Sequence, residues 1–280
     1  MSITVNTNMQ ALRIQNNLNN ATAKMNTSME RMSSGSRINS AADDAAGLAV
    51  ATRMEATVRS SKIASDNVAI GSNLLDTTEG NLNAILENVQ RIRDLAEQAA
   101  SGTYSATDLT ALEAEAQARA DEITRAAGIA SFNGITLFTG AGTAIDLQVG
   151  TTSAAGDTLT LAASLFAAAD STALGINGIA AAFATSAAAK TFLGTLDTAI
   201  ADISDRVSEI GATQNRLTSI ADVLITQQTN LTSSISTIKD ADVAEESASY
   251  VASQILQSAS ATLLVQANSA PQIALTLIKG

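Results

Sequence analysis

Residues 196–238 read LDTAIADISDRVSEIGATQNRLTSIADVLITQQTNLTSSISTI. Every seventh position from Leu196 onward is leucine or isoleucine, and a second, mostly apolar column from Leu193 to Ile235 lies three residues ahead of it. Apolar residues that recur at alternating intervals of three and four positions predict a helix that packs along one seam. At about 1.5 Å per residue the seam is roughly 60 Å long, so the helix needs a partner of comparable length. The first column comprises Leu196, Ile203, Ile210, Leu217, Leu224, Leu231 and Ile238.

Residues 68–99 offer that partner, because they carry a second apolar seam of similar length that includes Leu75, Leu82 and Val89. Gly71 interrupts this seam at a cost of ~1 kcal/mol in helix propensity relative to alanine, so we expect it to permit the close approach of another helix. The sequence therefore predicts a mainly α fold. Its core is a long antiparallel helical bundle or coiled coil, with the amino- and carboxyl-terminal segments packed together.

The composition favours thin helical layers and excludes several classes of site. Hydrophobic residues make up 46% of the 280 residues, but aromatics only 2%, with no Trp. With neither Cys nor His, disulfides, thiolate metal sites and the commonest general base are excluded. The net charge of −11 argues against a nucleic-acid partner, which would require a basic surface. We expect no enzymatic activity, no cofactor and no metal.

Both ends of the chain carry amphipathic helical patterns, in segments 11–32 and 248–270. A lone helix of this length is marginal in water, and we expect that neither stripe has an adequate partner within a single chain. The stripe residues that we expect to pack against another copy are Ile14, Leu18, Met25 and Met32 near the amino terminus, and Ile255, Leu263 and Leu264 near the carboxyl terminus.

Between the seams, the pattern changes from helix to strand. Ser105 with Asp108 has the spacing of a capping box that opens a third helix, and Ser40 with Asp43 has the same spacing before the second. Short strands are expected at 135–138, 145–149 and 158–161, with Asn133-Gly134 as a turn, and short helix and loop over 162–189. The acidic clusters at Asp43-Asp44 and 240–246 are interpreted as helix starts and not as cation sites.

These boundaries predict two domains: a terminal helical domain of residues 1–40 plus 240–280, and a long-helix domain of residues 41–239 that contains a β-hairpin region at about 132–165. The chain start lacks the pattern of a signal peptide, and no apolar run reaches the ~18 residues of a membrane span.

Several motifs resemble one family. RMSSGSRINSAADDAAG at residues 31–47 resembles the bacterial flagellins, and so do QRIRDLA at 90–96 and FNG at 132–134. Near the carboxyl terminus, DADVAEE at 240–246 is followed by QILQ at 254–257 and QANSAPQ at 266–272, which resemble the same family. The resemblance covers both ends and most of the helical core. The short middle leaves little room for outer domains, so the chain resembles a compact flagellin with only the two inner domains.

The resemblance implies a structural subunit that polymerises into the flagellar filament used for motility. It also implies export through the flagellar type III apparatus to an extracellular flagellum, with an export chaperone and a filament cap as partners, and no membrane insertion. We expect the terminal helices to be disordered in the monomer and to fold on assembly. The interruptions of the seam at Gln214 and Gln228 either fix its register or mark where it turns toward a neighbouring subunit.

The resemblance also implies a surface recognised by the animal Toll-like flagellin receptor, which would comprise Arg91, Leu95 and Glu115; packing between subunits is the other role open to them. Two alternatives to a filament subunit remain at this stage. One is a hook–filament junction protein of the same family, and the other is a secreted helical translocator that inserts into host membranes.

Overall fold

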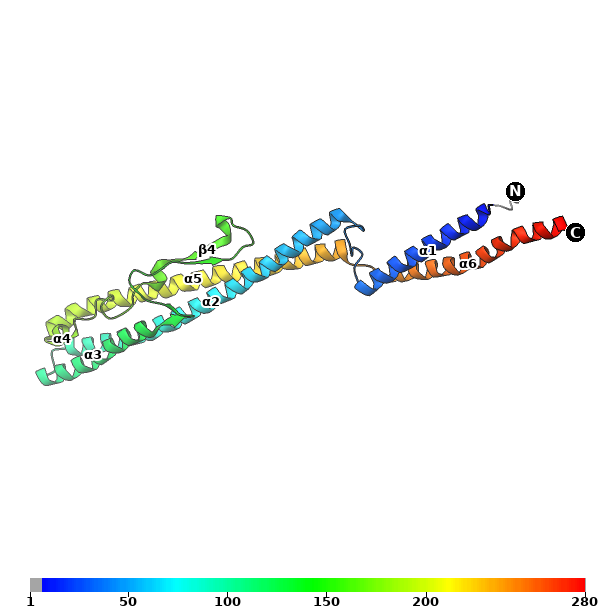
Figure 1. Cartoon of the computed structure of the whole chain (residues 1–280). Helices are drawn as coiled ribbons and strands as arrows, with labels where there is room; N and C mark the ends of the chain where they lie inside the picture. The colour runs from blue at the N-terminus through cyan, green and yellow to red at the C-terminus, as the bar shows by residue number, and fades with distance from the viewer. Residues whose placement is uncertain (1–6, 280) are drawn as a thin grey trace. The chain divides into compact units, whose positions relative to one another are not determined.

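The chain forms a mainly helical structure, as the periodicity predicted. A computed structural model (Figure 1) describes the backbone of residues 7–279 and the side chains of residues 7–269. Contacts divide the chain into two compact units, Met1–Val58 with Thr229–Gly280, and Arg59–Gln228, which are called the terminal unit and the central unit below. The long helices α2 (Ala45–Ala100) and α5 (Ser186–Lys239) contribute residues to both units.

The terminal unit contains α1 (Met9–Ser34) and α6 (Val243–Lys279), together with the start of α2 and the end of α5. The central unit contains the rest of α2 and α5, the helices α3 (Ala106–Ile129) and α4 (Ile179–Phe183), and two short 3₁₀ helices. Along the chain, two antiparallel strand pairs follow α3 and precede α4. They are β1 (Ser131–Phe132) with β2 (Ile135–Thr136), and β3 (Ile145–Gln148) with β4 (Thr158–Leu161).

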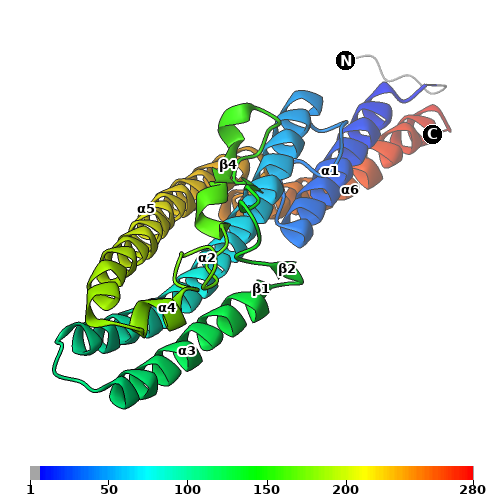
Figure 2. The same ribbon diagram turned by 90° about the vertical axis from the view of Figure 1, so that its left-hand side faces the viewer.

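The central unit is built on α2 and α5, which run antiparallel and share one apolar core, with α3 lying beside α2 (Figure 2). The antiparallel direction follows from two polar contacts, because Asp76 meets Gln214 whereas Arg93, further along α2, meets Asp197, further back along α5. The seam residues Leu75, Leu82, Val89, Leu196, Ile203, Ile210, Leu217 and Leu224 are all buried in this core, and Leu231, in the terminal unit, is half-buried.

Gln214, which interrupts the second column of α5, bridges the two long helices. Its Nε2 donates to Asp76 Oδ1 at 2.7 Å and to Glu79 Oε2 at 3.2 Å. A cross-helix amide of this kind favours one register of an otherwise regular seam. Of the two roles considered for Gln214, the contacts within the chain therefore favour fixing the register.

Gly71 has a different role from the one its place in the seam indicated. A Cβ added there would lie 2.3 Å from Leu147 Cδ1, on strand β3. The β3–β4 hairpin thus lies directly against α2, and Asn67 Nδ2 donates to Gln148 O at 2.9 Å to hold it. The prediction that Gly71 makes room for another helix was wrong, because the seam pattern cannot show that a strand packs against the same helix.

The helix starts match the predicted capping only in part. Ser105 and Asp108 form the expected reciprocal capping box at α3. At α2, Ser40 N–H and Oγ do hydrogen-bond to Asp43, but the helix begins later, at Ala45, and the carboxylate of Asp44 accepts the N–H of Gly47. Asp44 is therefore the residue that caps α2, and the Ser40–Asp43 pair stabilises the turn before it.

The middle of the chain contains one strand that the sequence did not indicate. β1 precedes the Asn133-Gly134 turn, and both turn residues have positive φ, 49° and 79°, as a two-residue type I′ turn requires. β1 is only two residues long, which is too short to show alternation. α5 begins at Ser186, ten residues before Leu196.

Candidate functional site

The candidate site is the pair of terminal helices, α1 and α6, which pack against each other along most of α1. Ile14, Leu18, Met25 and Met32 are half-buried on α1. Each helix is thus the other's partner within the chain, as the expected packing of the two termini predicted. That neither stripe has an adequate partner stays a prediction, because Ile255 and Leu263 on α6 remain exposed. A stripe on one helix indicates that a partner exists but not which one.

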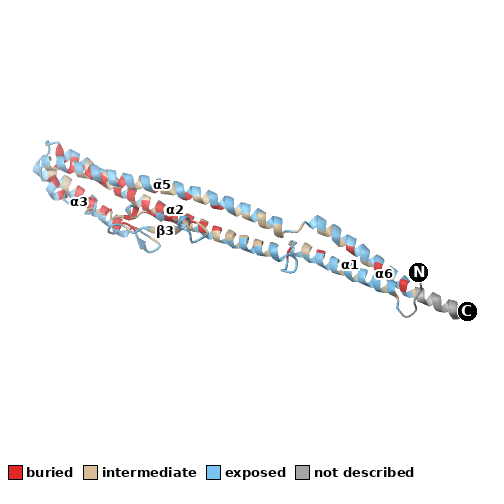
Figure 3. Ribbon diagram, turned by 90° about the horizontal axis from the view of Figure 1, so that it is seen from above, coloured by how far each residue is buried: buried red, intermediate tan, exposed pale blue. Residues whose placement is uncertain are grey.

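The buried positions of this pair are small or polar. They are Ala21 and Ser28 on α1, and Ser253, Ser260 and Ala267 on α6, each 9% exposed or less. The three α6 residues follow one another at intervals of seven, so this signal was present in the sequence. An apolar stripe does not reveal it, because serine is a polar residue. Figure 3 shows the consequence, since buried residues are sparse along α1 and α6 and dense in the central unit.

Polar contacts between α1 and α6 determine their antiparallel register. Gln257 Nε2 donates to Thr22 Oγ1 at 3.1 Å, and the hydroxyls of Ser28 and Ser249 are 3.2 Å apart. Toward the start of α1, Asn8 Nδ2 donates to Ala267 O at 2.8 Å. Because each of these bonds contributes only ~1 kcal/mol net, they select a register more than they hold the pair together.

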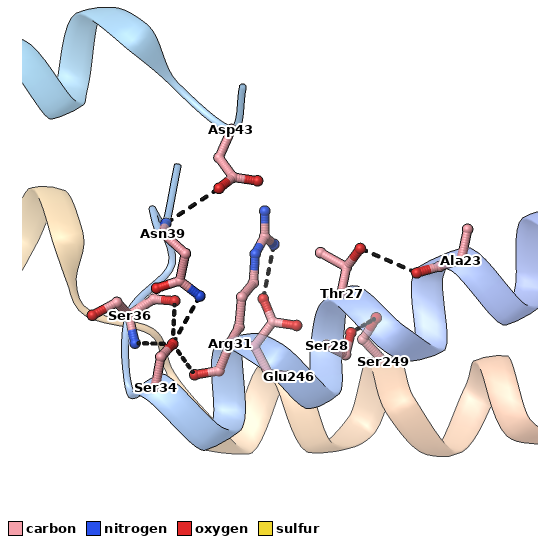
Figure 4. A network of polar contacts seen from close by, with 10 residues as sticks. All are labelled: Ala23, Thr27, Ser28, Arg31, Ser34, Ser36, Asn39, Asp43, Glu246 and Ser249. Atoms are coloured by element: carbon pink, nitrogen blue, oxygen red, sulfur yellow. Dashed lines mark hydrogen bonds and ion pairs between the residues drawn. The ribbon is translucent and has the colours of Figure 1, made fainter. Parts of the chain in front are cut away.

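One ion pair, between Arg31 and Glu246, lies at the end of this seam (Figure 4). Arg31 Nη1 is 3.0 Å from Glu246 Oε1, and the two side chains are 29% and 13% exposed. Burial disfavours the charged form of Glu246, but hydrogen bonds from Arg31 and Ser28 and the charge of Arg31 outweigh it and lower the pKa of the carboxyl. The pair lines a surface hollow of about 420 Å³ between the two helices.

The loop before α2 and the link between α5 and α6 are tied together next to this ion pair. Arg37 N–H donates to Lys239 O at 2.6 Å, and Ala241 N–H donates to Gly35 O at 3.0 Å. Lys239 in turn forms an ion pair with Glu55, at 2.9 Å. Residues of the 31–47 motif thus hold the loop between α1 and α2 against the link between α5 and α6.

The part of α6 that α1 leaves uncovered carries exposed apolar side chains. Val251, Ile255, Ala259 and Leu263 occur at every fourth position, and with Leu256 they form what we call the α6 outer face. Ile255 is 63% exposed and Leu263 57% exposed, whereas Leu264 is half-buried toward α1. Within the described residues, this face has no covering element of its own chain.

Charge is distributed unevenly along the chain. From Ser247 to Ile278, α6 has no charged residue at all. The central unit carries a net charge of −10, from 9 Lys and Arg against 19 Asp and Glu, out of the total of −11. The terminal unit is therefore nearly neutral, and copies of the outer face can approach one another without charge repulsion.

The three residues expected at a receptor surface come together on α2 and α3. Arg91 Nε and Nη2 donate to Glu115 Oε1 at 2.9 and 2.7 Å, with both side chains substantially exposed. Leu95 is only 1% exposed, so it supports the helix pair from beneath and does not present a surface.

The described part of the chain contains no group of three or more acidic side chains placed to hold a metal ion. Among the same residues, no helix is both long and apolar enough to cross a membrane.

Comparison with known proteins places these features in a family. The chain matches the family model of the bacterial flagellin N-terminal helical region over residues 5–143, and that of the bacterial flagellin C-terminal helical region over residues 193–278. The chain belongs to the bacterial flagellins. This flagellin is 37% identical to a flagellin of Xenorhabdus nematophila and 31% identical to flagellin A of Vibrio anguillarum, in each case over the whole of both chains.

The solved structures add a likeness in fold. A structure from Vibrio parahaemolyticus, described as a flagellar hook-associated protein, aligns with a TM-score of 0.60 at 18% identity, over 71% of this flagellin and all of that chain. At that identity the likeness shows a shared fold only.

Proposed function

We propose that this flagellin is the structural subunit of an extracellular flagellar filament, and that the α6 outer face is one of the surfaces by which subunits pack. The observation that carries the proposal is the contrast between the two sides of α6. One side meets α1 through serine and alanine, whereas the large apolar side chains Val251, Ile255 and Leu263 face solvent.

A solvent-facing row of large apolar side chains is unfavourable for a monomer. Covering one such side chain contributes roughly 1.5–3 kcal/mol, and a contiguous exposed apolar surface is typical of a protein–protein contact. Because every copy has the same row along α6, the free energy gained by covering these side chains would favour association of many copies into a homopolymer. No enzymatic step is needed for this, and the family is one of structural proteins.

The seam between α1 and α6 supports a second part of the proposal, that the pair is weak in the free chain and becomes ordered on assembly. Ser28, Ser253 and Ser260 bury little apolar area, so the gain on pairing is small against the entropy of ordering two helices. Limited proteolysis of the monomer should trim the chain before about Asn39 and after about Asp240. Uniform resistance of both segments would contradict weak pairing.

Such weak pairing suits secretion. We propose that the chain is exported through the flagellar type III apparatus, with a chaperone before export and the filament cap afterwards. A subunit whose terminal helices separate easily is easier to thread through a narrow channel than one with a strong terminal core.

The direct test of assembly compares Leu263→Asp with Leu263→Met. The aspartate places a charge in the apolar contact and should abolish filaments, whereas methionine keeps an apolar side chain of similar volume and should retain them. Leu18→Asp, on α1, should also abolish filaments, and all three monomers should keep a helical central unit by circular dichroism. Normal filaments from Leu263→Asp would refute the proposed contact.

The most specific part of the proposal concerns recognition by a receptor. The exposed Arg91–Glu115 pair would supply a cation and an anion to the animal flagellin receptor, with Leu95 holding α2 and α3 in place from below. In a receptor reporter assay, Arg91→Ala should weaken the response to monomer, while Arg125→Ala, which removes an exposed arginine elsewhere on α3, should not. An unchanged response to Arg91→Ala would remove this part of the proposal.

A further inference from the structure

We infer that Asn133 and Asn177 are sites of spontaneous modification, at which the side-chain amide is converted to aspartate and isoaspartate without any enzyme. Both asparagines are followed by glycine, both lie outside helices, and both are exposed. They are the two Asn-Gly pairs of the sequence.

The chemistry is an intramolecular displacement. The backbone nitrogen of the following glycine gives up its proton and attacks Cγ of the asparagine. The Cγ–Nδ2 bond breaks, and ammonia leaves with that proton, which water relays to Nδ2. Water then opens the resulting five-membered imide at either carbonyl, which leaves aspartate or isoaspartate. No electron is transferred, water is the only co-reactant, and the close approach of the two groups within one dipeptide makes the attack effective.

The local structure leaves both reacting groups accessible at Asn133. The residue lies in the two-residue turn between β1 and β2, and its side chain makes no hydrogen bond among the described residues. Gly134 is exposed, and a Cβ built on it would have no neighbour within 4 Å, so nothing packs against the Cα of the residue that supplies the attacking nitrogen.

Asn177 has a similar setting. Gly178 caps the short helix α4 through its backbone only, without a side-chain hydrogen bond, and the space beside its Cα is also empty. Buried Ile176 and Ile179 flank the exposed pair on either side.

Among the residues that the structure describes, the other asparagines are protected in identifiable ways. Most lie inside the long helices, where the N–H of the following residue is bonded within the helix and cannot approach the side chain. Asn39, which is followed by serine in a loop, has its side-chain Nδ2 bonded to Ser34 Oγ at 2.9 Å (Figure 4). The two Asn-Gly pairs therefore differ from the rest in sequence and in surroundings.

Isoaspartate at position 133 would alter the fold as well as the charge. The main chain then passes through Cβ, which lengthens a two-residue turn by one carbon and removes its type I′ geometry. Directly after β2, Leu137 N–H donates to Ala130 O at 2.9 Å, and Leu137 and Phe138 are buried. A longer turn would loosen the attachment of these two side chains to the core of the central unit.

The test is a time course on the intact, folded chain at mildly alkaline pH, with peptide mass spectrometry that separates isoaspartate from aspartate. We expect amide loss at Asn133 and Asn177 well before Asn39, and no further conversion at 177 in Asn177→Gln. If either asparagine stays an amide in the folded chain while the same chain in denaturant converts, the assignment at that position is overturned.

A second measurement separates charge from backbone lengthening. The variant Asn133→Asp carries the new charge without the extra carbon, so its thermal unfolding should match that of the fresh chain, whereas the aged chain enriched in isoaspartate at 133 should unfold at a lower temperature. Equal unfolding temperatures for the aged chain and the fresh chain would overturn the structural consequence.

Discussion

The central seam and the terminal seam are both helix pairs of heptad type, but they are built from different side chains. Leu75, Leu82 and Ile203 are fully buried between α2 and α5, whereas Ser28, Ser253 and Ser260 occupy the buried positions between α1 and α6. The central pair can be stable by itself because large apolar side chains are removed from water. The terminal pair gains less in this way, because the large apolar residues of α1 are only half-buried and Ile255 and Leu263 on α6 are exposed.

This difference assigns separate tasks to the two units. The central unit has its own core and carries nearly all of the net charge. The terminal unit has a seam of small and polar residues, a net charge near zero and an exposed apolar face. We propose that a chain built in this way folds in its middle before assembly and completes its ends by contact with other copies.

Removal of one seam side chain in each unit should give the largest contrast. Leu82→Ala should destabilise the central unit by about 3 kcal/mol, because it leaves a cavity in a fully packed core. Ser253→Ala should change the stability of the terminal unit by less than about 1 kcal/mol. Urea unfolding followed by circular dichroism measures both. Similar losses for the two variants would mean that the seams are equivalent.

A pair of glycine variants should give the next largest contrast. Gly142 and Gly35 both have positive φ, but a Cβ at Gly142 would collide with the carbonyl of Ala163, whereas at Gly35 it would have no neighbour within 4 Å. Gly142→Ala should therefore cost about 2–3 kcal/mol, from backbone strain and overpacking together. Gly35→Ala should cost only about 1 kcal/mol, from strain. Equal unfolding midpoints for the two variants would contradict the close packing at Gly142.

Acidification should have the smallest effect on the stability of the terminal unit. Because the pKa of Glu246 is lowered in the folded chain, its ion pair with Arg31 stabilises the terminal unit at neutral pH. That contribution is lost as the pH falls through the lowered pKa. Amide exchange in α6, compared at the same pH, should therefore rise on acidification more in the natural chain than in Glu246→Gln. The same acid response in both chains would show that this ion pair does not contribute.

Much of the fold was predictable because the central seam has a strong signal. The repeat from Leu196 to Leu224 indicated both α5 and the need for α2. The pairing of the terminal helices has a weaker signal in the sequence, since Ile255 and Leu263 are the conspicuous residues of α6 and both are exposed. The seam there consists of Ser253 and Ser260, residue types that occur just as often on exposed surfaces.

The role of Gly71 was equally hidden, because Leu147, which approaches it, lies 76 positions further along the chain (147 − 71). In the candidate site, by contrast, the helical spacing identified Ile255 and Leu263 of the outer face, although not Val251 or Leu256. Their burial in a filament depends on other copies, which neither the sequence nor a single chain contains.

Hydrogen exchange of the free chain and of assembled filaments, resolved along the sequence, tests the central claim most directly. In the free chain, amides of residues 9–34 and 243–269 should exchange much faster than those of 68–99 and 196–224, and in filaments they should become protected. Equal and strong protection of all four segments in the free chain would contradict the account, because the terminal pair would then be stable without its neighbours.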